Sequence, residues 1–322
     1  MSFNPLKSSA TSAAVSWKST GKLQKTLSRC IEKHGIGLHS GRSTKVKLWP
    51  ELAKKGRYFK VGNNLIETSI DFVKESPLCT ALCKDGVKVT TVEHLLSALE
   101  AIGVDNCCIE LTPTNPDDPI VEVPILDGSA REWVEAIEQT GLEDATDEEG
   151  NSCDKMAPYV NVPVHIRRKD SFIAAFPSQE IHISYGINFP EVPSIGCQWF
   201  FSKIFSGSFY ATEIAHARTF CVHEEVEKMR EMGLIKGGSL ENAIVCSASK
   251  GWLNSLLHFH DEPCRHKVLD LIGDLSIFAK SGNQGLPIAH IVAYKVTSTR
   301  LLTSVSWPVL DDGKEKGVGD IE

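Results

Sequence analysis

The sequence of 322 residues lacks several features that assign a protein to a broad class at once. No apolar run approaches the ~18–20 residues that a helix needs to cross a bilayer, so we expect no integral membrane protein. Basic residues are not in excess, since 34 Lys and Arg stand against 41 Asp and Glu and the net charge is −7. Nucleic-acid binding, which needs a basic face, is therefore disfavoured.

The ten cysteines lack the C-x-x-C spacing of a cysteine-built zinc finger. They are scattered along a chain much longer than the small secreted domains in which cysteine patterns indicate disulfides. We therefore expect mostly buried, free thiols in a reducing compartment.

Acidic residues are missing from the first 25 positions, which contain Lys7, Lys18, Lys22 and Lys25 among several serines. A basic, serine-rich start without acidic residues is typical of organelle transit peptides, and the apolar core of a secretory signal is absent. An ordinary disordered terminus is the alternative. We assign residues 1–21 to this transit or disordered segment.

An acidic stretch, EDATDEEGNSCD at 143–154, has the composition of a linker. Strand-like alternation occurs on both sides of it, for example at 45–48, 182–187 and 289–294. Helical periodicity occurs at 92–102, after Asp127-Gly128-Ser129, at 224–232 and at 264–278. This pattern predicts an α+β fold of two domains that pack face to face. The predicted boundaries are a first domain at 22–142, an acidic linker at 143–157, a second domain at 158–295 and a tail at 296–322.

One candidate site lies at the predicted start of the first helix. Thr90 and Glu93 have the spacing of a capping box, in which Glu93 would only bind the backbone of Thr90. The alternative is chemical, with Glu93 as a base and His94 as a metal ligand.

A second candidate lies on the predicted helix after residue 264. His266, Asp270 and Asp274 follow one another at intervals of four, so their side chains share one helix face. A His–Asp pair at this spacing can hold one cation, although a simple salt bridge is the alternative. Together the two helices offer two imidazoles and a carboxylate, the three-ligand set of catalytic Zn²⁺, with Glu93 as general base. We expect such a site in the cleft between the domains.

Several segments resemble one enzyme family and keep its order along the chain. They are HGIGLHSG (34–41), TVEHLLSAL (91–99), PILDGSA (124–130), ARTF (217–220), GGS (237–239), NAIV (242–245) and RHKVLDLIGDL (265–275). Together they resemble the UDP-3-O-acyl-N-acetylglucosamine deacetylases, the zinc amidases that commit material to lipid A synthesis. The resemblance covers about residues 22–295, and the transit-like start is similar to the family's plant members, which are mitochondrial.

The resemblance implies roles for individual residues. His94, His266 and Asp270 match the zinc ligands, Glu93 matches the general base, and Thr219 matches the hydroxyl that steadies the tetrahedral oxyanion.

Further residues match supporting positions of the family. Lys267 matches a catalytic lysine that meets the substrate's diphosphate, and Phe220 an aromatic contact near the sugar. Asp274 matches a carboxylate that pairs with a general-acid histidine. Cys79 matches a cysteine close to the metal, or is an inert core thiol.

The resemblance also implies a fold and partners. Each domain would be a β-sheet covered by helices, with the site between the two helical layers and an acyl-chain passage formed around residues 214–244. The implied partner is a UDP-linked acylated amino sugar, with membrane contact at most peripheral and through that lipid. We expect a monomer.

The chain departs from the family after Lys295. The family's general-acid histidine falls on Ser298, and no histidine follows His290. One explanation is an alternative or mistranslated C-terminus, and the other is a true variant with lost or altered turnover. The competing function is therefore a catalytically impaired isoform or paralogue that binds UDP-glycolipid or a protein partner.

We predict that this chain binds zinc and substrate but turns over poorly, because losing a general acid typically lowers a rate by about 10²–10⁴-fold. Acetate release from the UDP-sugar substrate measures this. Ser298→His, made together with the family's C-terminal pattern, should restore turnover. Family-level turnover of the unchanged chain, or no rescue by that variant, would contradict the prediction.

Overall fold

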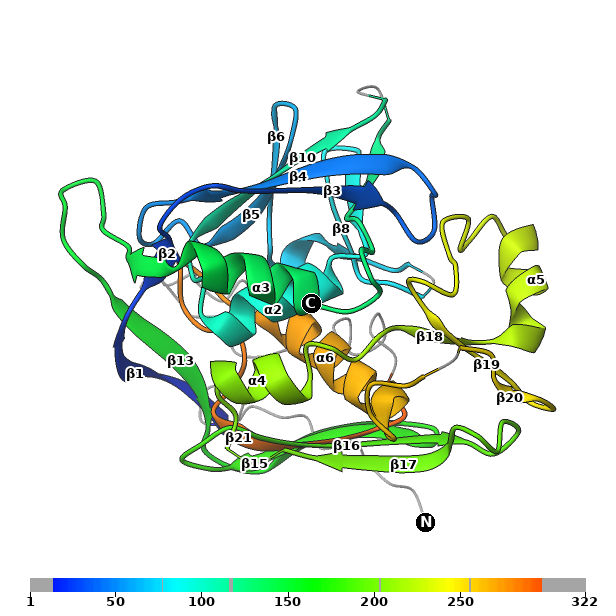
Figure 1. Ribbon diagram of the computed structural model, residues 1–322. Coiled ribbons are helices and arrows are strands. Elements are labelled where there is room, and N and C mark those ends of the chain that lie inside the picture. Colours follow the sequence, from blue (N-terminus) through cyan, green and yellow to red (C-terminus); the bar gives the residue numbers. More distant parts are fainter. Residues whose placement is uncertain (1–13, 77, 116–117, 203, 255, 297–322) are drawn as a thin grey trace, which may run out of the picture.

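A computed structural model describes residues 14–76, 78–115, 118–202, 204–254 and 256–296. Both halves of this part of the chain contain strands and helices, in agreement with the α+β class. Figure 1 shows one five-stranded sheet at the top and another at the bottom, with helices between them. No described helix has the length and apolarity needed to cross a membrane. The division into two domains stays a prediction.

The upper sheet in Figure 1 is built from strands that alternate buried and exposed side chains, as a sheet with one solvent face does. In its second strand Val46 and Leu48 are buried while Lys45 is exposed, within the stretch predicted as a strand. The strand order is β3 (Ile31–Ile36), β4 (Ser43–Pro50), β10 (Cys107–Pro113), β5 (Arg57–Val61) and β6 (Asn64–Glu67).

A four-stranded sheet leads into the first long helix. Its order is β11 (Ile120–Glu122), β9 (Val87–Thr90), β8 (Ala81–Lys84) and β7 (Val73–Lys74), with the short helix η1 (Ile70–Phe72) before β7. Helix α2 (Glu93–Ile102) follows β9 almost directly. Helix α3 (Arg131–Thr140) begins just after Asp127-Gly128-Ser129, where the sequence predicted it.

The lower sheet in Figure 1 belongs to the second half of the chain. Its order is β14 (Val164–Arg168), β15 (Ser171–Pro177), β21 (Ala289–Tyr294), β16 (His182–Phe189) and β17 (Gly196–Phe201). Only β16 and β21 pair in parallel. The bounds of β21 are those that the sequence predicted.

The remaining elements of the second half complete the site. A three-stranded sheet has the order β18 (Phe220–Val222), β19 (Ile244–Ser247) and β20 (Gly251–Trp252). The helices are α4 (Gly207–Glu213), α5 (His223–Glu231) and α6 (Glu262–Ser276). Helices α5 and α6 lie within two residues of the predicted bounds.

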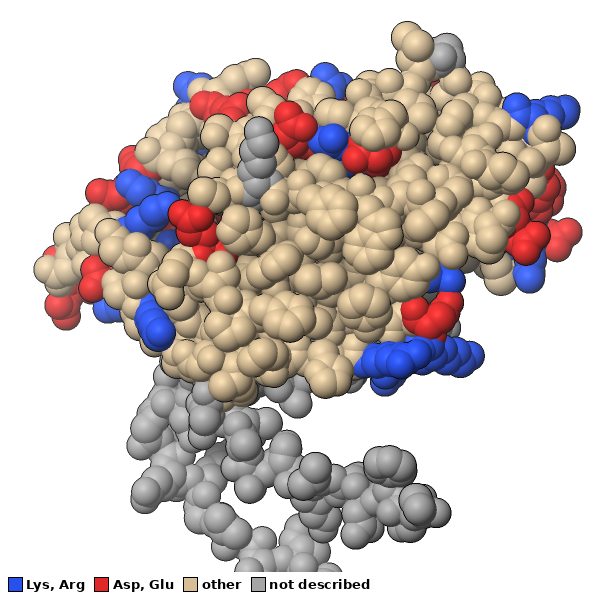
Figure 2. All heavy atoms as spheres, turned by 90° about the horizontal axis from the view of Figure 1, so that it is seen from below, with Lys and Arg blue, Asp and Glu red and all other residues tan. Residues whose placement is uncertain are grey.

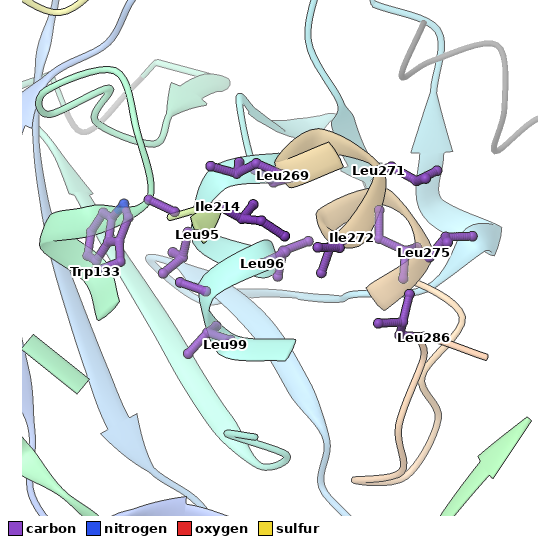
Figure 3. Packing of buried hydrophobic residues seen from close by; sticks show 14 of the residues in the cluster. Leu95, Leu96, Leu99, Trp133, Ile214, Leu269, Leu271, Ile272, Leu275 and Leu286 are labelled. Carbon is purple, nitrogen blue, oxygen red and sulfur yellow. The ribbon is translucent and has the colours of Figure 1, made fainter. Parts of the chain in front are cut away.

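Helices α2 and α6 pack against each other between the two five-stranded sheets (Figure 1). Helix α2 is buried from Glu93 to Glu100, because it packs against three other helices, α6, α3 and α4. Figure 3 shows the apolar cluster around this contact, in which Leu96 of α2 lies beside Ile272 of α6 while Leu95 lies toward Trp133. The inner layer therefore brings the two sequence-predicted site segments together.

Part of the segment that the sequence assigned to a transit or disordered region forms regular structure. Val15–Leu23 forms strand β1, which pairs antiparallel with β13 (Asp154–Val160). The strand forms despite its polar composition because pairing supplies the backbone hydrogen bonds and leaves most side chains partly exposed. Residues 1–13 lie outside the described part of the chain.

The acidic stretch expected to be a linker also contains ordered strand. Its first residues belong to β12 (Leu142–Asp144), which pairs with β2 (Lys25–Leu27), and its last residues belong to β13. Ala145 and Cys153 are buried with Ala53 in a small apolar cluster, while most acidic side chains stay exposed. All ten cysteines are free, as predicted.

A buried ion pair connects α2 to the end of α6. Arg57 of β5 donates to Glu100 Oε2 at 2.6 Å and to the carbonyl oxygen of Ser276 at 3.2 Å. The other oxygen of Glu100 accepts the backbone N–H groups of Gly285 and Leu286. Both charged side chains are almost fully buried. One carboxylate therefore holds together segments that lie far apart in the sequence.

We predict that Glu100→Gln lowers the free energy of unfolding by about 3–5 kcal/mol, because it leaves Arg57 as a buried charge without its counterion. Urea denaturation measures the change. Glu110→Gln is the control, since Glu110 pairs with the exposed Lys60 and its loss should shift the midpoint little. Equal midpoints for the two variants would refute the assigned role of Glu100.

Candidate functional site

A strained turn fixes the start of helix α2. Thr91 has a φ of 58°, in the left-handed region that β-branched residues rarely adopt. Its hydroxyl donates to Glu122 at 2.9 Å, and the same carboxylate accepts the backbone N–H groups of His39 and Ser40. These bonds hold the turn in a strained conformation, which is typical of functional sites.

Three buried side chains point their ligand atoms at one point between α2 and α6. Asp270 Oδ1 lies 3.5 Å from His94 Nε2 and 3.3 Å from His266 Nε2. The two imidazole rings are nearly perpendicular, with centroids 4.9 Å apart. The sequence-predicted ligand set is thus assembled from two helices that are about 170 residues apart in the chain.

The chemistry of these atoms fits a divalent metal such as zinc. A tetrahedral ion with bonds of about 2.1 Å separates its ligand atoms by about 3.4 Å, which matches the two distances above. Asp270 Oδ1 is buried without a hydrogen-bond partner in the described part of the chain, an arrangement that favours a cation. The same three residues form a cluster whose ligand atoms all lie within 4.8 Å of one another.

The protonation of the ligands also fits metal binding. His266 Nδ1 donates to the carbonyl oxygen of Ala217 at 3.0 Å, so Nε2 faces Asp270 with its lone pair. Burial lowers the pKa of His266 to about 4, which keeps the ring neutral at physiological pH. Burial opposes ionisation of Asp270, but His266 and Lys267 together hold its pKa below the ordinary value.

Glu93 is buried beside this cluster. Its Oε2 accepts the backbone N–H of Thr80 at 3.0 Å. Burial, with the charges of Asp270 and Asp274, raises the pKa of the Glu93 carboxyl well above its ordinary value. The capping-box alternative for Glu93 is wrong, because Thr90 ends strand β9 and no side chain caps α2.

A cavity of about 410 Å³ opens next to the cluster and is lined by Thr219, Phe220 and Lys267. Lys267 donates to Asp270 Oδ2 at 2.8 Å, and its Nζ lies 5.6 Å from the centre of the Phe220 ring. The backbone of Thr219 is fixed on both sides, by Gly128 and by Ile244 of β19. All three residues that the sequence placed near the reacting group therefore line one cavity.

The comparisons with known proteins agree with this geometry. Residues 24–301 match the sequence model of the UDP-3-O-acyl N-acetylglycosamine deacetylase family. The chain is 57% identical over 288 residues to the Arabidopsis thaliana protein named probable UDP-3-O-acyl-N-acetylglucosamine deacetylase 1, mitochondrial, covering 89% of this chain and 88% of that one. It is 43% identical over 278 residues to a UDP-3-O-acyl-N-acetylglucosamine deacetylase of Thermosynechococcus vestitus, covering 85% and 90%. A protein of the same name from Synechocystis is 41% identical over 290 residues, covering 89% and 98%.

The chain belongs to the UDP-3-O-acyl N-acetylglycosamine deacetylase family. The family match ends at residue 301, six residues beyond the break that the sequence predicted at Lys295. Ser298, the position that the resemblance gave to the general-acid histidine, lies outside the described residues.

The carboxylate expected to pair with that histidine is buried at the far end of the site. Asp274 Oδ1 accepts a hydrogen bond from the Thr80 hydroxyl at 2.6 Å. A cavity of about 10 Å³, close to the volume of one water, is lined by Asp274, Tyr185, Lys267 and Val296 among others. Val296, the last described residue of the chain, thus lies beside Asp274.

Sequence reasoning missed two residues of this family site. Thr80 binds both Glu93 and Asp274, and His39 lines the cavity with both ring nitrogens buried and without partners among the described residues. His39 lies in the HGIGLHSG segment and Thr80 directly follows Cys79, which were the available signals.

Cys79 is buried with its Sγ 3.3 Å from Ser76 Oγ, and burial raises the pKa of its thiol to about 11. The thiol is therefore a poor ligand or nucleophile at neutral pH.

We predict that His266→Ala abolishes stoichiometric zinc binding, because it removes one of the three predicted ligands, the imidazole that the carbonyl oxygen of Ala217 orients. Elemental analysis of the purified protein after dialysis gives the zinc content. His260→Ala is the matched control. The His260 side chain is 90% exposed and lies just before the first residue of helix α6. Zinc retained at one equivalent in His266→Ala would rule out the assigned ligand set.

Proposed function

We propose that this protein is a zinc-dependent amidohydrolase that deacetylates UDP-3-O-[(3R)-3-hydroxyacyl]-N-acetylglucosamine. The products are acetate and UDP-3-O-acyl-glucosamine, and the reaction is the committed step of lipid A biosynthesis. One observation carries the proposal: two histidines and an aspartate converge on one buried point beside a glutamate, in a chain of the deacetylase family.

His94, His266 and Asp270 hold the metal in this proposal. Bound there, zinc supplies Lewis acidity, which acidifies water and polarises an amide carbonyl. Glu93 takes the proton from the attacking water, because it is a carboxyl without a role as ligand and lies beside the ligand cluster. The N–H of Thr80 keeps one Glu93 oxygen in place, which leaves the other oxygen to receive that proton.

The residues that line the cavity bind and orient the substrate. The hydroxyl of Thr219 donates to the oxyanion that forms from the acetyl carbonyl, where a fixed donor is worth most. The Lys267 ammonium meets negative charge on the diphosphate and assists catalysis, and Phe220 packs against the sugar. The cation–π contact between Lys267 and Phe220 favours this joint placement.

The cavity also offers apolar surface for an acyl chain. Nine of the side chains that line it are aliphatic or Met, namely Leu38, Leu78, Val226, Met229, Ile235, Leu240, Ala243, Val245 and Leu253. They come mainly from α5 and its flanks, within or near the segment 214–244 that was expected to form an acyl passage. A fatty acyl group would bury its methylenes here, each contributing about 0.8 kcal/mol.

The amine leaving group needs a proton, and Asp274 is the carboxyl at that end of the site. Its expected partner is the general-acid histidine, whose position is occupied by Ser298 in this chain. We therefore keep the prediction of low turnover. The competing function, a catalytically impaired isoform that binds UDP-glycolipid or a protein, keeps the same metal and substrate contacts and differs in turnover alone.

A mitochondrial location is part of the proposal. It rests on the basic, serine-rich start and on the Arabidopsis relative, whose name includes that compartment. A transit peptide that is removed before β1 would leave the paired strand Val15–Leu23 intact.

We predict that Glu93→Gln lowers the rate of acetate release by about 10²–10⁴-fold, because the amide cannot accept the proton of the attacking water. Zinc content should stay at the level of the unchanged chain, since Glu93 is not a ligand. Cys79→Ala is the control, because it alters a buried neighbour without catalytic function. A Glu93→Gln protein as active as the Cys79→Ala protein would exclude Glu93 as the base.

A further inference from the structure

The outer face of the lower sheet has no covering layer among the described residues. On its inner face Ile291 and Ala293 of β21 and Ile183 and Tyr185 of β16 are buried, toward α6. Strand geometry therefore turns the intervening residues outward. Figure 2 looks directly at this outer face and shows a broad area without charged side chains.

Aromatic side chains dominate that outer face. Its large members are Phe172, Phe176, Trp199, Phe201 and Tyr294, which we call the aromatic face. The exposed fractions of Trp199, Phe176 and Phe201 are 40%, 42% and 67%. Apolar residues of this size are usually exposed singly, so five on one sheet mark an interaction surface.

Part of the aromatic face forms a continuous row across four strands. Trp199 lies between Phe201 and Tyr294, with ring centres 6.0 and 5.6 Å away, and Tyr294 lies 6.0 Å from Phe172. Gly186 of β16 lies beneath, and a Cβ there would come within 2.8 Å of both Trp199 and Tyr294. The glycine thus lets the rings meet above the intervening strand.

Fixed charge on this face is confined to one end. Arg167 pairs with Phe172 in the strand register, and it is the only lysine, arginine or acidic residue among the described outward positions of the five strands. Arg168 and Lys169 follow in the exposed hairpin between β14 and β15. No ion pair with a carboxylate engages Arg167 or Arg168 in the part of the chain that the structure describes.

The possible occupants differ in what they offer Arg167. A second copy packed face to face would offer Arg167 no free carboxylate, because Asp170 of the hairpin already pairs with Lys295, and the guanidinium would be buried without a counterion. A nucleic acid would need a basic face, whereas this chain has a net charge of −7. An anionic phospholipid surface supplies phosphates for the hairpin and an apolar boundary for Trp, Tyr and Phe rings.

We propose that the aromatic face, with the basic hairpin Arg167-Arg168-Lys169, docks the protein on anionic phospholipid membranes. The rings enter the headgroup boundary and the hairpin contacts lipid phosphates. Because the chain as a whole has a net charge of −7, the basic hairpin favours an orientation with this end toward an anionic bilayer. The proposal does not depend on deacetylase activity.

Co-sedimentation of the full chain with vesicles tests the proposal. We expect binding to phosphatidylcholine vesicles that contain one third phosphatidylglycerol, weakening with added salt, and little binding to pure phosphatidylcholine. Phe201→Gln should weaken binding roughly tenfold through lost apolar burial. Arg167→Gln should weaken it roughly fivefold, as expected for one basic residue at the surface.

Matched variants separate docking from general surface effects. Trp49 has the same 40% exposure as Trp199 but lies on β4, so Trp49→Gln should bind as the unchanged chain does while Trp199→Gln binds less. Arg29→Gln is the control for Arg167→Gln. If Trp199→Gln fails to fold, Phe201→Gln decides. The proposal is overturned if vesicles do not bind the chain, if the controls lose binding equally, or if sedimentation equilibrium shows a dimer that Phe201→Gln dissociates.

Discussion

The close approach of helices α2 and α6 is the constraint on which the site depends. Gly273 lies directly against the backbone of Glu93, and a Cβ at this position would lie 2.1 Å from the Glu93 carbonyl oxygen. Ser97 of α2 strengthens the contact by donating to the carbonyl oxygen of Leu269 at 2.7 Å, and it accepts a bond from Tyr210. At any wider spacing His94 would not meet the ligand atoms of α6.

This closeness concentrates charge in a space with little water. Glu93, Asp270 and Asp274 are all buried, and Lys267 is the ammonium group that borders them. Buried carboxylates repel one another and lose hydration, so the arrangement costs folding free energy unless a cation compensates. The site is therefore a local source of instability that the surrounding apolar contact of α2 and α6 must offset, as is common where function constrains sequence.

Local patterns in the sequence were sufficient for the elements that carry the site. The bounds of β21 and the helix that holds His266 and Asp270 follow from alternation and from four-residue spacing, which depend only on near neighbours. Their assembly with His94 was inferred from residue chemistry and family resemblance. The structure supports this assembly, because the ligand atoms of His94 on α2 lie close to those of His266 and Asp270 on α6.

Contacts between distant segments account for what the sequence did not predict. Nothing near Val15 indicates that its partner is Val160, so β1 was assigned to a terminal segment. Thr80 and His39 reach the site through loops whose positions depend on Glu93 and Glu122, and no periodicity reports such contacts. Glu93 followed a capping-box pattern, but the tertiary partner Thr80 took its carboxylate instead.

The pairing of β1 with β13 has a consequence for the order of events during synthesis. Residues 15–23 cannot find their partner until residues 154–160 have left the ribosome, since the two strands belong to opposite ends of the first half of the chain. For that interval β1 has no partner strand, and its backbone N–H and C=O groups must form hydrogen bonds with water instead.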